Sequence, residues 1–479
     1  MDIRTELLID GEWTAGTGHF PDINPATEEV IAEVQEAGPR EVDAAVSSAR
    51  EAVEDPAWRH MNPHRRAELL WKLADLVEER AEELARVETL DNGKPTFESY
   101  RIDLPFVVQN YRYYAGWADK VMGETIPVSG PFLNYTLREP VGVVGAIIPW
   151  NFPLSLASWK VAPALACGNA VVLKPAEETP LTALLLGELA LEAGFPPGVL
   201  NVVPGRGEVT GQALVEHPGV DKIAFTGSTE TGRLIMRAAA GTLKKVSLEL
   251  GGKSPNVIFA DAEMEAAVRG ATTGIFYGKG EVCAAGSRLL VEEGVKEEVV
   301  ERLVARAAKM MPGDPAHPKT RLGPLVSKHQ QERVLSYIEA GRTDGATLLC
   351  GGEAARVGGK GYYVQPTVFD GVDPEMRIAR EEIFGPVVAV LGFSDLEEAI
   401  DRANQTIYGL AAGVWTRDVG KAHRFARDVK AGTVWVNTYN MYDSASPFGG
   451  YKQSGFGRDL GRHALEEYTN VKSVWVGLD

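Results

Sequence analysis

Apolar and polar positions follow two different rhythms along the chain, and the first rhythm predicts helices in its N-terminal part. After a short strand pattern at Thr5–Ile9, apolar residues recur at helical spacing near Val42–Val53, Pro63–Leu90 and Tyr100–Lys120. Residues three and four positions apart share one face of an α-helix, so these stretches are typical of amphipathic helices. A hairpin is predicted next, because two short runs within residues 124–137 flank a Ser-Gly-Pro turn.

From residue 141 the rhythm changes to short, continuously apolar segments that alternate with helical stretches. Buried parallel strands joined by crossover helices produce this pattern. The predicted strands are Val141–Ile148, Ala170–Leu173, Val199–Val203, Lys222–Phe225 and Val246–Leu250. The predicted helices between the later strands are Leu181–Ala193, Glu208–Val215 and Glu230–Ala240. A second α/β unit is predicted after residue 251, with helices near Val295–Lys309, Lys328–Ala340, Asp395–Asn404 and Val419–Val429.

The C-terminal segment Tyr468–Val476 has the pattern of a strand whose neighbour is not evident. An unpaired strand exposes a row of amide and carbonyl groups, and pairing satisfies them. A neighbouring subunit is the economical partner for such a strand.

Composition and charge argue against several classes of function. The chain has 479 residues, of which 44% are hydrophobic and 24% charged, as in ordinary globular proteins of roughly two to four domains. The formal charge of −17 argues against nucleic acid, because phosphate binding needs a basic face. The N-terminus has no signal-peptide core, and no apolar run approaches the roughly 20 residues that span a membrane. Three cysteines without paired spacing favour a reducing compartment, so we expect a cytoplasmic protein with no membrane partner.

One of the three cysteines stands in a setting that suits a nucleophile. Cys283 lies in Gly-Glu-Val-Cys-Ala-Ala-Gly-Ser-Arg, residues 280–288, where glycine and small residues leave room for an electrophile. Most free cysteines are instead small core hydrophobes. Cys167 and Cys350, which follow apolar residues, fit that interpretation better.

Two predicted strand ends carry polar residues that could assist such a thiol. Asn151 follows Ile-Pro-Trp and precedes Phe-Pro, so its amide is held outside the strand and could face an oxyanion. An Asx turn is the alternative. Glu249, in Leu-Glu-Leu-Gly-Gly, is an acid within an apolar strand end, where a carboxylate is either paired or used. A raised pKa there would suit a general base, and a buried salt bridge is the alternative.

Other strand ends favour a phosphate-bearing ligand. Phe225-Thr-Gly-Ser leads a strand through Gly227 into a helix, whose free amides can bind phosphate. The G-x-G-x-x-G fingerprint is absent, and Gly205-Arg-Gly207 with Gly211 has the wrong spacing. Lys174 and Glu177 end another strand, where a carboxylate can hold ribose hydroxyls.

Taken together, these segments resemble the aldehyde dehydrogenase superfamily, in its hydrolytic NAD(P)-dependent branch. The resemblance runs from Asn-Pro-Ala-Thr at residues 24–27 to Pro-Phe-Gly-Gly-Tyr-Lys-Gln-Ser-Gly at residues 447–455. It implies that Cys283 is the nucleophile and Glu249 the general base, while Asn151 and the backbone N–H of Cys283 form the oxyanion hole. Lys160 matches a lysine with a charge-relay role in some members, and a plain ion pair explains it equally well.

The resemblance also implies a cofactor and an architecture. NAD is expected, because a 2′-phosphate of NADP would meet the charge of Glu177, although NADP stays possible; no metal ligand is implied. The implied cofactor contacts are Ile147, Trp150, Lys174, Glu177, Gly207, Gly227, Ser228, Gly232, Leu250, Glu382 and Phe384. The implied α/β fold has a Rossmann-like parallel-sheet NAD-binding domain (1–123 and 139–250) and a second α/β catalytic domain (251–447). A small β-strand oligomerisation arm (124–138 and 448–479) implies a homodimer or homotetramer.

The implied reaction oxidises an aldehyde to a carboxylic acid through a thioester on Cys283, which water hydrolyses with help from Glu249. The site is expected to lower the thiol pKa from its ordinary value near 8.5, through the positive charge of the bound nicotinamide and through local amides. Lys279 could add to this effect, and a solvated flank is the alternative for it. Three alternatives are a CoA-acylating relative, a cysteine hydrolase and a structural protein that reuses the fold. The presence of both Cys283 and Glu249 argues against the first and the last. Candidate pocket residues, which suggest an apolar or aromatic aldehyde, are Phe152, Trp159, Val282, Tyr439, Tyr442 and Phe448.

Overall fold

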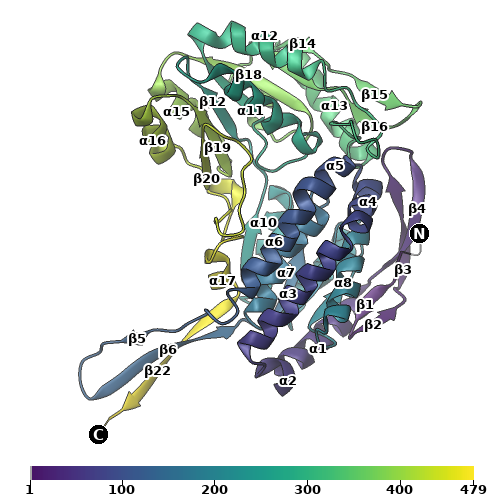
Figure 1. The fold of residues 1–479 in the computed structure, drawn as a ribbon, viewed down its shortest axis with the longest axis vertical. Coiled ribbons are helices and arrows are strands. Elements are labelled where there is room, and N and C mark those ends of the chain that lie inside the picture. The colour runs from purple at the N-terminus through teal and green to yellow at the C-terminus, as the bar shows by residue number, and fades with distance from the viewer. Residues whose placement is uncertain (1–2, 479) are drawn as a thin grey trace.

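Two open, mostly parallel β-sheets organise the chain in a computed structural model that describes residues 3–478. The first sheet has eight strands in the order β2-β1-β9-β8-β7-β10-β11-β21, and the second has seven in the order β14-β17-β18-β13-β12-β19-β20. In Figure 1 the helices of the first unit fill the lower half, the second unit lies above, and a thin arm extends to the lower left. The predicted α/β class is therefore confirmed.

The five strands predicted after residue 141 form the parallel centre of the first sheet, with ends shifted by one or two residues. They are β7 (Val143–Ile147), β8 (Ala170–Lys174), β9 (Leu200–Val202), β10 (Lys222–Thr226) and β11 (Lys245–Glu249). Antiparallel strands β1 (Leu7–Ile9), β2 (Glu12–Thr14) and β21 (Gly455–Phe456) complete its two edges. Because the central strands are parallel, their carboxyl ends meet at one edge, where ligands bind in open α/β sheets.

The helices around the first sheet agree with the prediction in part. The stretch predicted as one helix from residue 63 to 90 is two helices that meet at Arg80, and the stretch from 100 to 120 starts with a π-helical turn and ends at Ala115. The helices are α1 (Pro39–Glu54), α2 (Pro56–Arg59), α3 (Pro63–Glu79), α4 (Ala81–Asn92), α5 (Thr96–Glu98), α6 (Leu104–Ala115), α7 (Pro153–Ala166), α8 (Leu181–Ala193), α9 (Gln212–Glu216) and α10 (Thr229–Ala239). A π-helical turn, Gly207–Gly211, precedes α9 and replaces the start of the helix predicted there.

Helix α7 has no counterpart among the predicted helices, and the reason is its surroundings. All of its residues are buried, so it has no polar face and no amphipathic period. It packs between the sheet and α6, and it carries Lys160.

The second unit repeats the α/β pattern after residue 251. Its strands are β12 (Pro255–Ile258), β13 (Arg288–Glu292), β14 (Thr347–Cys350), β17 (Thr367–Asp370), β18 (Val387–Phe393), β19 (Ala411–Trp415) and β20 (Thr433–Val436). Its helices are α11 (Met264–Phe276), α12 (Lys296–Ala307), α13 (Lys328–Thr343), α14 (Arg377–Arg380), α15 (Leu396–Asn404) and α16 (Val419–Asp428). The four helices predicted here are confirmed as α12, α13, α15 and α16, whereas α11 and the short α14 were not predicted.

Two hairpins and a three-stranded arm complete the described chain. The hairpins are β3 (Gly18–Asn24) with β4 (Glu29–Glu36) and β15 (Ala354–Val357) with β16 (Lys360–Val364). The arm consists of β5 (Thr125–Ile126), β6 (Phe132–Pro140) and β22 (Thr469–Gly477) in the order β22-β6-β5. The C-terminal strand thus finds one partner, β6, within its own chain. Its other edge pairs with no strand of residues 3–478.

The segment between the second sheet and the tail returns to the first unit. There β21 joins the first sheet, and the short helix α17 (His463–Glu467) packs against α7. Residues 448–467, predicted as part of the arm, therefore contact the first unit. In the part of the chain that the structure describes, no helix is long and apolar enough to cross a membrane.

Candidate active site

The carboxyl edge of the first sheet collects the side chains predicted from the strand ends. Ile147 lies beside Lys174 across β7 and β8, and beside Phe225 across β7 and β10. Thr226 lies beside Glu249 across β10 and β11. The register of the parallel strands therefore brings together residues that are up to about a hundred positions apart in the sequence.

Cys283 lies on a tight loop that faces this edge from the second unit. The loop follows α11 through a 3₁₀ turn at Tyr277–Gly280, in which Gly278, Lys279 and Gly280 have positive φ angles of 55°, 63° and 73°. A Cβ atom on Gly280 would lie 2.2 Å from the carbonyl oxygen of Gly385, so this glycine is required by space as well as by conformation. Cys283 is partly exposed, whereas Cys167 is buried.

Glu249 ends β11 beside the Cys283 thiol and is almost fully buried. Neither of its carboxylate oxygens has a hydrogen-bond partner within residues 3–478. Burial raises the pKa of Glu249 to about 8, and the charge of Asp459 adds to this effect, while Lys160 and the thiol oppose it. The salt-bridge alternative is thus not realised at Glu249. A buried carboxyl with a pKa near neutrality suits a general base.

The thiol of Cys283 does not have the lowered pKa that the sequence led us to expect. Burial, and then the nearby Glu249 carboxylate, raise its pKa well above the ordinary value. A hydrogen bond from the backbone N–H of Ala284 opposes this effect. In the chain by itself, the protein therefore holds this thiol in its neutral form.

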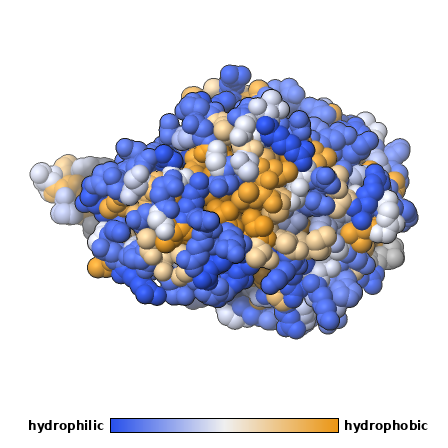
Figure 2. Space-filling view, turned by 90° about the horizontal axis from the view of Figure 1, so that it is seen from above, coloured by the Kyte–Doolittle hydropathy of each residue, from blue (hydrophilic) through white to orange (hydrophobic). Residues whose placement is uncertain are grey.

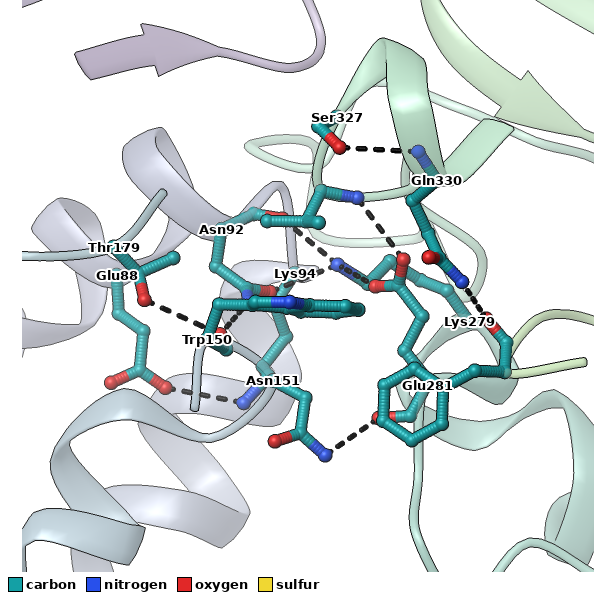
Figure 3. A network of polar contacts seen from close by, with 12 residues as sticks. Glu88, Asn92, Lys94, Trp150, Asn151, Thr179, Lys279, Glu281, Ser327 and Gln330 are labelled. Carbon is teal, nitrogen blue, oxygen red and sulfur yellow. Dashed lines mark hydrogen bonds and ion pairs between the residues drawn. The ribbon is translucent and has the colours of Figure 1, made fainter. Parts of the chain in front are cut away.

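Asn151 is held by the loop that carries the thiol. Its Nδ2 donates to the carbonyl oxygen of Glu281 at 2.9 Å, and its Oδ1 has no partner in the described chain, so no Asx turn forms. The carbonyl of Trp150 accepts a hydrogen bond from Asn92 Nδ2 at 2.6 Å (Figure 3). One N–H of the Asn151 amide is therefore used, and the second remains for another acceptor.

Lys160 forms an ion pair with an acid from the C-terminal segment. Its Nζ lies 3.0 Å from Asp459 Oδ2, and both side chains are buried. A small cavity of about 10 Å³ is lined by Lys160, Glu249 and Asp459, among others. The ion pair predicted as one interpretation of Lys160 is therefore present, and a charge-relay role for this lysine stays a prediction.

The cofactor positions lie around the same edge. Lys174 Nζ and Glu177 Oε2 form an ion pair at 3.2 Å, in which the lysine is buried and the glutamate is more exposed. Ser228 caps α10, its Oγ accepting the N–H of Thr231 at 3.1 Å, and Gly227 N–H donates to the Glu249 carbonyl at 3.1 Å. The start of α10 therefore presents a capped helix end next to Glu249.

Two aromatic rings and an acid stand between the two units. The Trp150 and Phe384 rings meet edge to face, with centroids 5.2 Å apart. Glu382 Oε1 accepts the N–H of Gly252 at 3.0 Å, and burial raises the pKa of this carboxyl to about 7. The segment after α14 therefore contacts the loop after β7 through Phe384 and the segment after β11 through Glu382.

The remaining positions implied by the resemblance differ in their surroundings. A Cβ atom on Gly232 would approach the Leu250 side chain to 2.7 Å, so the glycine lets α10 pack on the strand end. Gly207 begins an exposed π-helical turn, and a Cβ atom there would meet nothing within 4 Å. Ile147 is nearly buried at the end of β7.

Aromatic side chains border the thiol, as the candidate pocket residues suggested. Trp159 contacts Phe448 and Tyr442, with ring centroids 5.5 Å and 6.3 Å away. Tyr439 donates its hydroxyl to the carbonyl of Ala284 at 2.9 Å. Phe152, Val282 and Cys283 belong to the same hydrophobic cluster. The surface beside the thiol is thus mainly apolar.

Lys279 and Asn92 are structural members of the site that sequence reasoning missed. Lys279, expected as a solvated flank, is buried and paired with Glu281 at 2.8 Å. Its Nζ also donates to the backbone carbonyl and Oδ1 of Asn92, at 2.8 Å and 2.9 Å. The two lysine-to-asparagine contacts join residues 187 positions apart, and no local pattern signals them.

Comparison with known proteins identifies the family. A model of the aldehyde dehydrogenase family matches residues 13–474. The chain belongs to the aldehyde dehydrogenase family. Human mitochondrial aldehyde dehydrogenase is 52% identical over 475 residues, which cover 98% of this chain and 92% of the relative. Human retinal dehydrogenase 2 is 51% identical, with the same two coverages. A structure of a Bacillus cereus aldehyde dehydrogenase in complex with NAD⁺ has a TM-score of 0.98 and 54% identity, covering 99% of this chain and 97% of that one.

Proposed function

We propose that Cys283, Glu249 and Asn151 carry out the NAD-dependent oxidation of an aldehyde to a carboxylic acid, the chemistry of the family to which this chain belongs. The observation that carries the assignment is the position of the Cys283 thiol beside the buried, unpartnered carboxyl of Glu249 at the carboxyl edge of the sheet. A nucleophile and a base in contact are the arrangement that covalent catalysis needs.

The side chains divide the reaction into two halves. The Cys283 thiol first loses its proton to solvent water, and its sulfur then forms a bond to the aldehyde carbon. The free N–H of Asn151 together with the Cys283 backbone N–H stabilises the resulting oxyanion. NAD, when bound, accepts the two electrons and the hydrogen that leave the substrate carbon. A thioester on Cys283 remains. Glu249 then takes a proton from water, the hydroxyl attacks the thioester carbon, and the acid leaves as the sulfur is released.

The residues at the sheet edge fit NAD. Ser228 and Gly227 stand at the start of α10, where helix amides can hold phosphate. Glu177, partly exposed and held by Lys174, can accept the ribose hydroxyls. Glu382 and Phe384 approach the edge from the second unit. Hydrolysis is favoured over transfer to CoA, because the base for water is present and buried beside the thiol.

An apolar or aromatic aldehyde is the proposed substrate class, because aromatic rings border Cys283. In a screen of NADH formation, we expect kcat/KM for aliphatic and aromatic aldehydes to exceed that for carboxylated or aminoaldehydes by about ten-fold or more. With NADP in place of NAD, the same screen should show a lower kcat/KM. The substitution Glu177→Gln should reduce this difference between the two cofactors. A preference for charged aldehydes would contradict this assignment.

The arm is the proposed oligomerisation surface. The outer edge of β22 is open, and large hydrophobic side chains are exposed on the arm, among them Phe132, Val471 and Trp475. Exposed hydrophobic patches mark interaction sites. Figure 2 shows a further hydrophobic patch on the face of the molecule that is seen from above. A homodimer or homotetramer would pair the open edge of β22 and bury the exposed hydrophobic side chains. The three free cysteines suit a reducing compartment such as the cytoplasm.

Sedimentation velocity tests the arm directly. The unaltered chain is expected to sediment as a dimer or tetramer. The double variant Val471→Glu/Trp475→Glu should shift it towards the monomer, because charge would be buried in the interface. Asn470→Glu, on an exposed polar position of the same strand, is the control and should leave the distribution unchanged. A monomeric unaltered chain would refute the proposal.

A further inference from the structure

A closed ring of polar contacts joins Asn151 to the loop that carries Cys283 (Figure 3). Asn92 Nδ2 donates to the carbonyl of Trp150 at 2.6 Å, and Asn92 Oδ1 accepts from Lys279 Nζ at 2.9 Å. Lys279 Nζ pairs with Glu281 Oε2 at 2.8 Å. Asn151 Nδ2 donates to the carbonyl of Glu281 at 2.9 Å, and this closes the ring because Asn151 follows Trp150.

The side chains that form this ring of polar contacts are buried inside the protein. The Lys279 and Glu281 side chains are 2% and 1% exposed, and Asn92 is fully buried. The second oxygen of Glu281, Oε1, accepts the N–H of Val326 at 3.1 Å, which ties the ring to the segment before α13. Separating a buried ion pair leaves two uncompensated charges, which strongly destabilises the folded protein. The Lys279 and Glu281 side chains are therefore held together.

The backbone of the loop depends on the same contacts. Lys279 has a φ of 63°, in the left-handed region that disfavours residues other than glycine. Such a conformation persists only when the surroundings determine it. The three contacts of Lys279 Nζ, with Glu281 and with two oxygens of Asn92, are surroundings of this kind. The conformation of the loop up to Cys283 is thereby linked to the ring.

We propose that Lys279 is a positioning residue that acts through Glu281 and Asn151. The Lys279–Glu281 pair fixes the segment whose carbonyl engages one N–H of the Asn151 amide, and this directs the second N–H to the substrate oxyanion. The inference rests on the oxyanion role proposed for Asn151. It adds residues that do not touch the substrate but determine where the amide points.

A double-mutant cycle tests whether Lys279 acts through Asn151. The measured quantity is the rate constant of the pre-steady-state burst of NADH, which reports formation of the thioester. We expect Lys279→Met to lower it by about 10-fold to 100-fold, the range for a misplaced catalytic group. In the Asn151→Ala background the same substitution should change it by less than about two-fold, because the group through which Lys279 acts is gone. Multiplicative effects in the double variant would overturn the proposal.

Two further measurements separate positioning from loss of structure. Alkylation of Cys283 by iodoacetamide needs no oxyanion hole, so its rate in Lys279→Met should match that of the unaltered enzyme; a parallel loss would show a disordered loop and overturn the proposal. Lys244→Met is the matched control, because Lys244 is also buried and donates to the carbonyls of Val215 and His217 at 2.7 Å. That variant should keep the burst rate constant.

A neutral version of the pair covers the case in which Lys279→Met does not fold. The double variant Lys279→Gln/Glu281→Gln removes both charges together and keeps hydrogen-bonding groups. Its burst rate constant should therefore lie within about three-fold of that of the unaltered enzyme. A burst as slow as that of Asn151→Ala would overturn the proposal. If Asn151→Ala itself leaves the burst unchanged, the proposed oxyanion role is wrong. If Asn151→Ala is slow while both Lys279 variants are fast, only the role of Lys279 is wrong.

Discussion

Cys283→Ala is expected to lower aldehyde-dependent NADH formation by about 10⁴-fold or more, to background, while NAD binding stays nearly unchanged. The sulfur is the only atom proposed to bond to the substrate, and alanine leaves nothing in its place. The edge residues assigned to NAD come from other segments, β8, the start of α10 and the loop after α14, so they should remain folded. Absorbance at 340 nm measures turnover, and titration calorimetry measures NAD affinity.

The matched control for this variant is a second free thiol. Cys350 is half-buried on β14, and its Sγ contacts the carbonyl of Pro366 at 3.8 Å, far in the sequence from every proposed catalytic residue. Cys350→Ala should keep normal turnover. Persisting turnover in Cys283→Ala would refute the nucleophile assignment, and a simultaneous loss of NAD affinity would show that the substitution disturbs more than the thiol.

Glu249→Gln is expected to retain the burst of NADH and to slow steady-state turnover by about 10²-fold to 10⁴-fold, the usual contribution of a general base. Glutamine keeps the size of the side chain but cannot take a proton from water, so the thioester should form and then persist. Stopped-flow absorbance separates the two phases. The exposed Glu466→Gln serves as control and should leave both phases intact.

The pH dependence of steady-state turnover, which thioester hydrolysis limits, also follows from Glu249. The pKa of Glu249 is raised to about 8, mainly by burial, and only the deprotonated form acts as a base. Thioester hydrolysis should therefore increase as the pH rises through about 8 and fall below it. In Glu249→Gln this rise should be absent. If that variant shows neither burst nor turnover, Glu249 acts earlier, in removing the proton of Cys283.

The elements that were predicted correctly are those whose signal is local. The central strands of the first sheet are buried on both faces and read as continuous apolar runs, and α8 has the bounds that were predicted. Elements were missed where burial removes the pattern, as in the fully buried α7. The break at Arg80 was missed because the apolar spacing continues through it.

The candidate site divides in the same way. Asn151, Glu249 and Cys283 could be proposed from the sequence, because each stands in a local setting that suits its chemistry and because their order resembles the family. The partners of Lys160 and Lys279 were not found, since Asp459 and Asn92 lie 299 and 187 positions away. The expected lowering of the Cys283 pKa relies on the bound nicotinamide. In the chain by itself, burial and then the neighbouring Glu249 carboxylate raise this pKa instead, and neither effect has a local signal in the sequence.

By itself, the sequence determined the fold class and the family and located the candidate catalytic residues, because periodicity and motif order are properties of neighbouring positions. Only the tertiary structure decided which charges meet, which carboxyl stays unpartnered, and that the tail pairs with β6 of its own chain. These depend on burial and on contacts between distant segments. The raised pKa of Glu249 and the ring around Lys279 arise only when the two sheets come together.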